Sequence, residues 1–227
     1  MRNAIRRVST YGAAFSIVFF VSAATAQTAP TRFERQMAKI TLGINGYGEF
    51  SADSSGTTYV PQTVAQVPSN TAGALGELRY EKSPLIGMQM NYGYARYTQN
   101  FTVNDTNGTP SGQLPFILGV QSKVTEFGLG YVAHGPKLFG LQPFGGAGVA
   151  ALQYKPTAGG GEHLPEQVRA GFYYAIGLEE SVFSEHFGLR VQFRQLFFGA
   201  PDFNQNYFAT GARSMTTEPV AGFFVRF

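Results

Sequence analysis

TTEPVAGFFVRF, the stretch from Thr216 to Phe227, ends the chain and alternates between two kinds of side chain. Ala221, Phe223, Val225 and Phe227 share one parity and are all apolar, whereas the other parity mixes arginine, glycine, valine and phenylalanine. Successive side chains of a strand point to opposite faces. The stretch therefore predicts a β-strand with one apolar face.

The opposite end of the chain, residues 1–26, has the form of a secretion signal. Three arginines form a basic start, residues 13–21 form a short apolar run, and Ala24-Thr25-Ala26 has the small residues of a cleavage site. The apolar run is too short to cross a bilayer as a helix. The alternative, a retained membrane anchor, is disfavoured by these flanks, and we expect a cleaved signal peptide and an exported protein.

Removal of the signal peptide changes the charge of the chain. The full sequence has 17 Lys and Arg against 14 Asp and Glu, and cleavage leaves 14 of each. A neutral mature chain gives no reason to expect a nucleic-acid partner. The absence of cysteine excludes disulfides, thiolate zinc sites and cysteine nucleophiles. No stretch after the signal is apolar enough for a spanning helix, so a membrane protein of this sequence must be a closed barrel.

Alternating patterns recur along the mature chain and predict an all-β fold, an eight-stranded antiparallel transmembrane β-barrel over residues 39–227. Residues 27–38 are polar and predict a periplasmic lead-in. The connections alternate between long and short, as periplasmic turns and outer loops do in outer-membrane barrels. The first long connection, residues 52–70, has no pattern and predicts an irregular loop. The predicted strands are residues 39–50, 71–81, 85–98, 118–133, 142–154, 168–179, 187–198 and 216–227.

Alternation alone does not say whether the apolar faces contact lipid or the core of a soluble lipocalin-like barrel, and a soluble secreted barrel or sandwich stays open. The opposite faces are rich in glycine, which suits a narrow interior. Aromatic residues near the strand ends suit an interfacial girdle. We therefore expect the apolar faces outside. The girdle residues are Phe50, Tyr80, Tyr94, Tyr131, Tyr154 and Tyr174, and the outward set of strand 142–154 is Phe144, Ala150, Leu152 and Tyr154.

Four segments carry a resemblance to a known family, namely Gly76 to Tyr80 before the Ser83-Pro84 turn, Glu126 to Tyr131, Arg190 to Arg194, and Pro219 to Phe227. Together they resemble the OmpA-like transmembrane domain and its opacity-protein relatives over nearly the whole mature chain. The resemblance implies a monomer in the outer membrane, in contact with lipid and lipopolysaccharide. It also implies that Phe223, Val225 and Phe227 form the signal that the barrel-insertion machinery recognises. No peptidoglycan-binding domain follows here, so we do not expect a wall-anchoring role.

Charged residues on the predicted inner faces are the candidate site. Five are acidic and five basic, and a narrow lumen leaves such groups unpaired only at a cost of about several kcal/mol each. We predict an ion-pair network that plugs the lumen. The alternative is a gate whose pairs rearrange to open a narrow, low-conductance path. The residues are Glu77, Arg79, Glu126, Arg169, Glu179, Arg190, Arg194 and Glu218, together with Glu49 and Arg226.

Other chemical signals in the sequence are weak. Asp105 to Gly108 partly resembles a calcium loop, but the bidentate glutamate is missing. His134 and His186 fall at predicted periplasmic turns, and His163 stands alone in a loop, so no catalytic set forms. We expect no enzyme, metal or cofactor. The predicted function is a structural or surface-interaction outer-membrane barrel whose outer loops are the candidates for an extracellular ligand. The alternative is a small-solute, low-conductance porin or channel.

Overall fold

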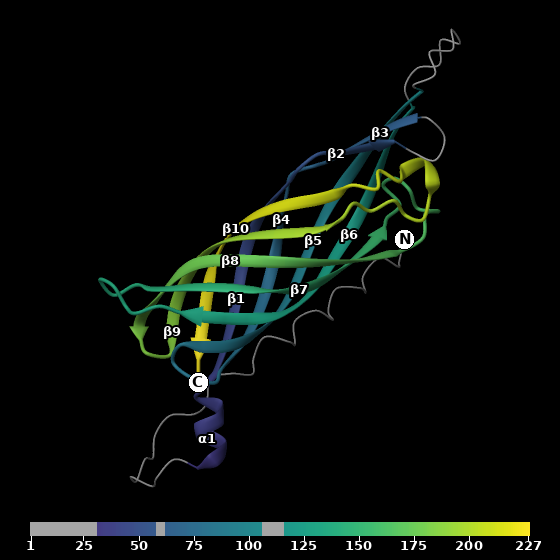
Figure 1. The fold of residues 1–227 in the computed structure, drawn as a ribbon. Coiled ribbons are helices and arrows are strands. Elements are labelled where there is room, and N and C mark those ends of the chain that lie inside the picture. The colour runs from purple at the N-terminus through teal and green to yellow at the C-terminus, as the bar shows by residue number, and fades with distance from the viewer. Residues whose placement is uncertain (1–30, 58–61, 106–115) are drawn as a thin grey trace, which may run out of the picture.

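The computed structural model describes residues 31–57, 62–105 and 116–227 (Figure 1). Within them, eight long antiparallel strands form a barrel, which closes through the pairing of β5 with β6. The predicted eight-stranded antiparallel barrel is confirmed. The last strand pairs with the first, as Leu42 opposite Val225 illustrates. The barrel strands are β1 (Ile40–Ser51), β4 (Thr71–Glu81), β5 (Ile86–Asp105), β6 (Phe116–His134), β7 (Gln142–Pro156), β8 (Gln167–Ser184), β9 (Phe187–Gly199) and β10 (Arg213–Arg226).

The first long connection is not the irregular loop that the sequence predicted. It contains β2 (Ser54–Thr57) and β3 (Gln62–Pro68), and β3 pairs with the last residues of β5. The pattern was missed because the buried face of β3 is partly polar. Gln66 is buried and donates a hydrogen bond to the side chain of Gln99 on β5. A strand held by a polar ladder shows no apolar alternation.

The two ends of the barrel differ. The end at which the C-terminus lies, called the terminal end here, has the short connections and α1 (Arg32–Met37) (Figure 1). Thr31 and Glu34 form a capping box at the start of α1, and the Tyr80 hydroxyl donates a hydrogen bond of 2.8 Å to Gln36. The opposite end, called the far end, carries β2, β3 and the short 3₁₀ helix η1 (Asn206–Phe208).

Parts of the predicted organisation lie outside the described residues. The predicted signal peptide is one of them, and most of the calcium-like stretch is another. The predicted lead-in, residues 27–38, contains α1, and its place in the periplasm stays a prediction. In the portion that the structure describes, no helix is both long and apolar enough to cross a membrane.

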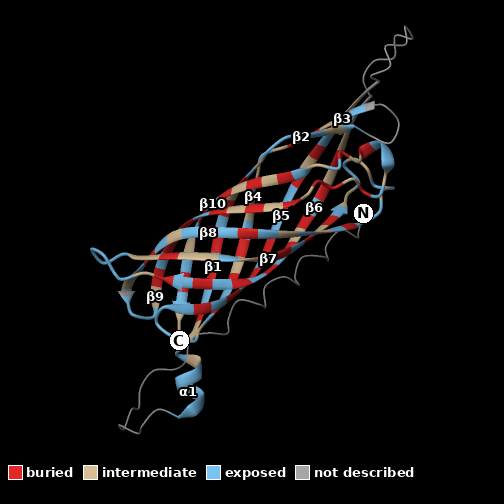
Figure 2. Cartoon of the chain, in the orientation of Figure 1, coloured by how far each residue is buried: buried red, intermediate tan, exposed pale blue. Residues whose placement is uncertain are grey.

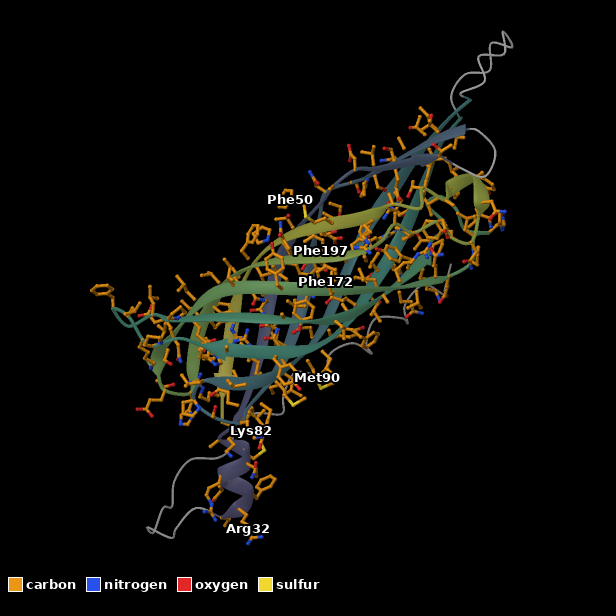
Figure 3. The ribbon with its side chains drawn as sticks, viewed as in Figure 1. Arg32, Phe50, Lys82, Met90, Phe172 and Phe197 are labelled. Atoms are coloured by element: carbon orange, nitrogen blue, oxygen red, sulfur yellow. The ribbon has the colours of Figure 1, made fainter. Side chains whose placement is uncertain are left out.

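Buried and exposed residues alternate along the barrel strands, with apolar side chains outside (Figure 2). Ile44 is 76% exposed and Met90 56% exposed. Phe172 and Phe197 stack on the outer surface of β8 and β9 with ring centroids 4.8 Å apart (Figure 3). The predicted outward orientation of the apolar faces is confirmed for every barrel strand except β7. The girdle residues found on the outside are Phe50, Tyr80, Tyr94, Tyr131 and Tyr174.

Strand β7 has the opposite orientation to the predicted one. Its apolar residues Phe144, Ala150, Leu152 and Tyr154 are buried inside, so Tyr154 is not part of the girdle, and Val149 faces outward. Between Pro143 and Leu152 both faces of this strand consist of small or apolar residues, and the interior that it meets at the far end is itself aromatic. Hydrophobicity therefore could not distinguish the two faces of β7.

Candidate functional site

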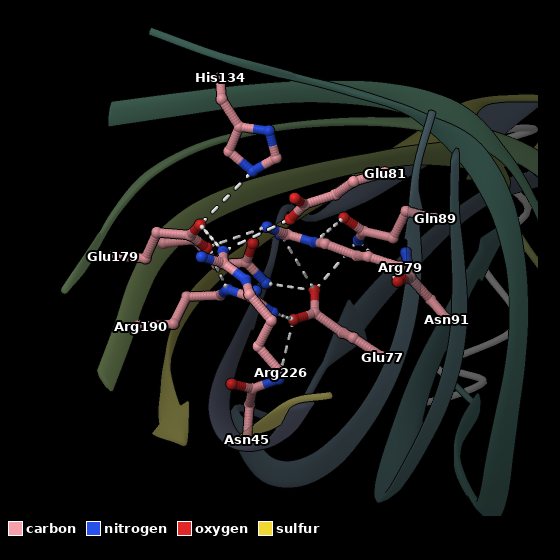
Figure 4. A network of polar contacts seen from close by, with 11 residues as sticks. Asn45, Glu77, Arg79, Glu81, Gln89, Asn91, His134, Glu179, Arg190 and Arg226 are labelled. Carbon is pink, nitrogen blue, oxygen red and sulfur yellow. Dashed lines mark hydrogen bonds and ion pairs between the residues drawn. The ribbon is translucent and has the colours of Figure 1, made fainter. Parts of the chain in front are cut away.

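Charged side chains fill the interior toward the terminal end, and Glu179 of β8 is one centre of this terminal network (Figure 4). Its carboxylate accepts hydrogen bonds from Arg79 at 3.2 Å and Arg190 at 3.0 Å. His134 Nε2 lies 3.4 Å and Arg226 Nη2 3.5 Å from the other carboxylate oxygen. One buried carboxylate thus joins side chains from β4, β6, β9 and β10.

Glu77 of β4 is the second centre of the terminal network. Its carboxylate accepts hydrogen bonds from Arg190 at 2.7 Å, Gln192 at 2.9 Å, Gln89 at 3.0 Å and Asn45 at 3.0 Å. Arg190 therefore bridges the two carboxylates at Glu77 and at the first centre. Four donors to one carboxylate satisfy its lone pairs, which a buried charge requires if it is not to destabilise the fold.

Aromatic rings inside the barrel cover the arginines of the terminal network. The guanidinium carbon of Arg79 lies 4.3 Å from the ring centroid of Phe144, and that of Arg190 lies 5.0 Å from that of Phe224. These contacts are in the range of cation–π interactions. A Cβ atom at Gly188 would lie 2.2 Å from the Phe224 ring, so glycine is needed there for the ring to occupy its position. With Phe144 included, every barrel strand supplies a residue to this region.

The structure adds two residues that the sequence did not place in the site. His134, predicted in a turn, is the last residue of β6 and is buried beside Glu179. Glu81 pairs with Arg226 at 3.4 Å at the edge of the network. The two-residue period could have identified both, because each lies two residues beyond a buried, inward-facing residue of its strand, Arg79 on β4 and Val132 on β6.

A second cluster surrounds Arg194 of β9. Its guanidinium pairs with Glu218 at 2.6 Å and with Glu126 at 2.9 Å, and it lies 4.4 Å from the centroid of the Tyr173 ring. Glu49 is also buried and interacts electrostatically with all three charged groups. Three carboxylates therefore face one guanidinium in this Arg194 cluster.

Arg169 does not join either cluster, contrary to the prediction of a shared network. It pairs with Asp202 at 2.7 Å near the far end, and both side chains are about one quarter exposed. Burial by itself raises the pKa of Asp202, but hydrogen bonds from Gln167 and the Asn204 backbone and the charge of Arg169 hold that pKa below its ordinary value. Since Arg169 pairs elsewhere, the Arg194 cluster carries an excess of carboxylates.

Aromatic side chains fill the interior at the far end. Phe101 stacks on Phe208 with ring centroids 4.2 Å apart, and Phe203 packs edge-on against both Phe101 and Tyr154. The hydroxyl groups of Tyr97 and Tyr154 are 3.2 Å apart. All five side chains are at most 3% exposed. This aromatic cluster comes partly from residues 200–212, a connection in which the sequence showed no pattern.

The remaining sequence candidates lie on the surface. Phe223, Val225 and Phe227 point outward at the end of β10, with exposed fractions of 56%, 41% and 39%. His163 and His186 are exposed, and the His186 Nδ1 lies 2.9 Å from the backbone carbonyl oxygen of Arg226. Among the residues that the structure describes, no group of three His, Cys, Asp or Glu side chains is arranged to hold a metal ion.

No protein-family model matches the chain, and no curated protein sequence matches it. Solved structures do match. Neisserial surface protein A superposes with a TM-score of 0.53 at 13% identity, over 83% of this chain and 97% of the other. The outer membrane protein OprG from Pseudomonas aeruginosa superposes with a TM-score of 0.53 at 14% identity, over 83% of this chain and 95% of the other. The chain thus has the fold of small outer-membrane barrels.

Proposed function

We propose that this protein is a non-enzymatic outer-membrane barrel with a plugged interior, which acts as a structural element of the membrane and presents the far end for contact with extracellular molecules. The observation that supports the proposal is the burial of interior side chains along the length of the barrel. The terminal network, the Arg194 cluster and the aromatic cluster follow one another along the interior, and their central residues Arg79, Arg194 and Phe101 are at most 1% exposed.

The three clusters close the barrel in series, so a path for ions needs all of them to open. Arginines in the two charged clusters each contact at least two carboxylates, and rearrangement of one pair leaves the other in place. The tightly packed rings at the far end carry no charge with which a passing ion could pair. A filled lumen therefore favours a structural or surface role over transport.

Planar-bilayer recordings test the plug. We expect no steady single-channel events from the refolded wild-type protein or from Glu77→Gln, because that change leaves the aromatic cluster closed. A double variant, Phe101→Ala with Phe208→Ala, is the matched test of the far end. Steady single-channel events in the wild type that Glu77→Gln alters would contradict the plug and support the alternative, a gate.

The runner-up function, a small-solute and low-conductance channel, has one observation in its favour. Gln192 Oε1 and Arg194 Nε are buried without a protein hydrogen-bond partner between the two charged clusters. Polar atoms of this kind suit water or a small polar solute. The bilayer recordings above separate the two functions.

The export and orientation of the chain are part of the same proposal. We expect cleavage after Ala26, the terminal end in the periplasm and the far end outside. N-terminal sequencing of the mature protein tests the cleavage. Because the chain has no cysteine, single-cysteine variants report the orientation: Tyr207→Cys should react with an impermeant maleimide on intact cells, and Lys82→Cys only after permeabilisation.

The same proposal covers the partners. The outward apolar faces would contact outer-membrane lipid and lipopolysaccharide, and the outward Phe223, Val225 and Phe227 would serve the insertion machinery. β3 pairs with β5, and Gln167 bonds to the Asp202 side chain at 2.6 Å, so the far end is held by defined contacts and offers a shaped surface to a ligand.

A further inference from the structure

The connection between β6 and β7 is a hairpin with an unusual turn. Leu138 and Leu141 exchange two backbone hydrogen bonds of 2.8 and 3.0 Å, so that only Phe139 and Gly140 form the loop. Their φ angles are 53° and 88°. Two positive φ angles define a type I′ turn, whose first position normally takes asparagine, aspartate or glycine. Phenylalanine in the left-handed region is strained, because its Cβ approaches the following carbonyl oxygen.

The same phenylalanine is fully exposed. Phe139 is 103% exposed and Leu138 57% exposed, so the protein does not cover the first and covers less than half of the second. A strained turn residue with an uncovered aromatic ring gains nothing within the fold. We therefore expect the ring at the tip of the hairpin to contact a surface outside the protein.

The position of the hairpin identifies that surface. Figure 1 shows the β6–β7 connection projecting sideways from the barrel wall at the terminal end, where the chain also ends. The last aromatic residue on the outward face of β6 is Tyr131, 66% exposed, a few residues before the hairpin. The neighbouring β4–β5 turn adds Leu85, 61% exposed, whose carbonyl accepts a hydrogen bond from the His134 amide. Exposed apolar side chains therefore lie on both elements that adjoin the base of the hairpin, β6 and the β4–β5 turn.

We propose that residues 137–141 form a membrane-interface anchor, which places Phe139 and Leu138 at the boundary between the acyl chains and headgroups of the phospholipid leaflet at the terminal end. The exposed Lys137 at the base of the hairpin then lies at the level of the lipid phosphates. A phospholipid leaflet fits better than a protein partner, because the hairpin extends from a part of the barrel wall whose outward side chains Tyr131 and Leu85 are themselves exposed and largely apolar. This anchor rests on the membrane orientation in the proposed function.

The absence of tryptophan from the chain allows a direct test. Phe139→Trp supplies a single fluorescent probe at the tip of the hairpin. The refolded variant is placed in phosphatidylcholine vesicles whose lipids carry bromine either near the glycerol or near the end of the acyl chain. Two control probes are Phe172→Trp, on the outer surface of β8, and Tyr207→Trp, in the exposed far-end connection.

We expect Phe139→Trp to show blue-shifted emission and stronger quenching by the shallow bromines than by the deep ones, and Tyr207→Trp to show neither. Emission of Phe139→Trp that matches that of Tyr207→Trp would overturn the anchor while Phe172→Trp remained quenched. Loss of quenching at Phe172→Trp as well would contradict the membrane orientation itself. If Phe139→Trp does not refold, Leu138→Trp in the same hairpin serves as the probe, with the same outcomes.

Discussion

The terminal end and the far end of the barrel interior are filled in opposite ways. At the terminal end, carboxylates and guanidinium groups pair through directional contacts, as around Glu77 and Glu179. At the far end, the rings of Phe101, Phe203 and Phe208 pack without charge. Charge pairs stabilise only when each partner is present, whereas apolar packing declines gradually with each atom removed. The two ends should therefore respond differently to substitution and to pH.

The largest effect should come from removal of the guanidinium of the Arg194 cluster. Arg194→Met leaves buried carboxylates without their cation, and we expect a loss of about 3–5 kcal/mol in the free energy of unfolding. Urea titration with gel mobility as the folding readout measures it. Arg213→Met, at an exposed arginine, is the control and should match the wild type. Equal midpoints for both variants would show that the cluster does not stabilise the barrel.

A somewhat smaller effect is expected from the aromatic cluster. Phe101→Ala removes a fully buried ring that stacks on Phe208, and such truncations cost about 3 kcal/mol. Phe172→Ala, on the lipid-facing surface, is the control for the loss of a phenylalanine. Phe101→Leu should recover most of the stability, since only the volume of the side chain should matter in the aromatic cluster. If Phe101→Leu is as damaging as Phe101→Ala, the proposed difference between the two ends is wrong.

Acid should loosen the rim of the far end through Asp202. Its pKa is lowered in the folded state, so its stabilising contribution is present above the ordinary value of 3.8 and is lost as the pH falls through the lowered value. Because the pair with Arg169 is partly exposed, we expect a change below about 1 kcal/mol. Hydrogen exchange of residues 200–212 measures it. Asp202→Asn should remove the pH dependence, and its persistence in that variant would assign it to another group.

The smallest effect is expected at the exposed pair of Lys155 and Glu166. The hydrogen bond from Lys155 holds the pKa of Glu166 below its usual range, yet both side chains are about half exposed. Exposed pairs are screened by solvent and salt. Glu166→Gln should therefore leave the denaturation midpoint unchanged at both low and high salt. A salt-dependent drop would show that this pair resembles the buried ones.

Much of this architecture followed from alternation along the chain. The eight barrel strands, the outward apolar faces and the inward charges at Glu77, Arg190 and Arg194 could be predicted because side chains alternate with a fixed period of two residues. A strand with one lipid-facing side shows that period plainly. The inference failed on β7 and β3, because both faces of each strand have similar polarity and the period does not show which face points inward.

The sequence by itself determined the fold class, the number of barrel strands and the parity of most of them, because these are local properties of each stretch. Only the tertiary structure decided which inward groups meet. It separated Arg169 from the predicted network, brought His134 to Glu179, and built the aromatic cluster from Phe203 and Phe208 in a connection without a pattern. The physical reason is that strand register and connection geometry set these distances, and both depend on pairing between segments far apart in the chain.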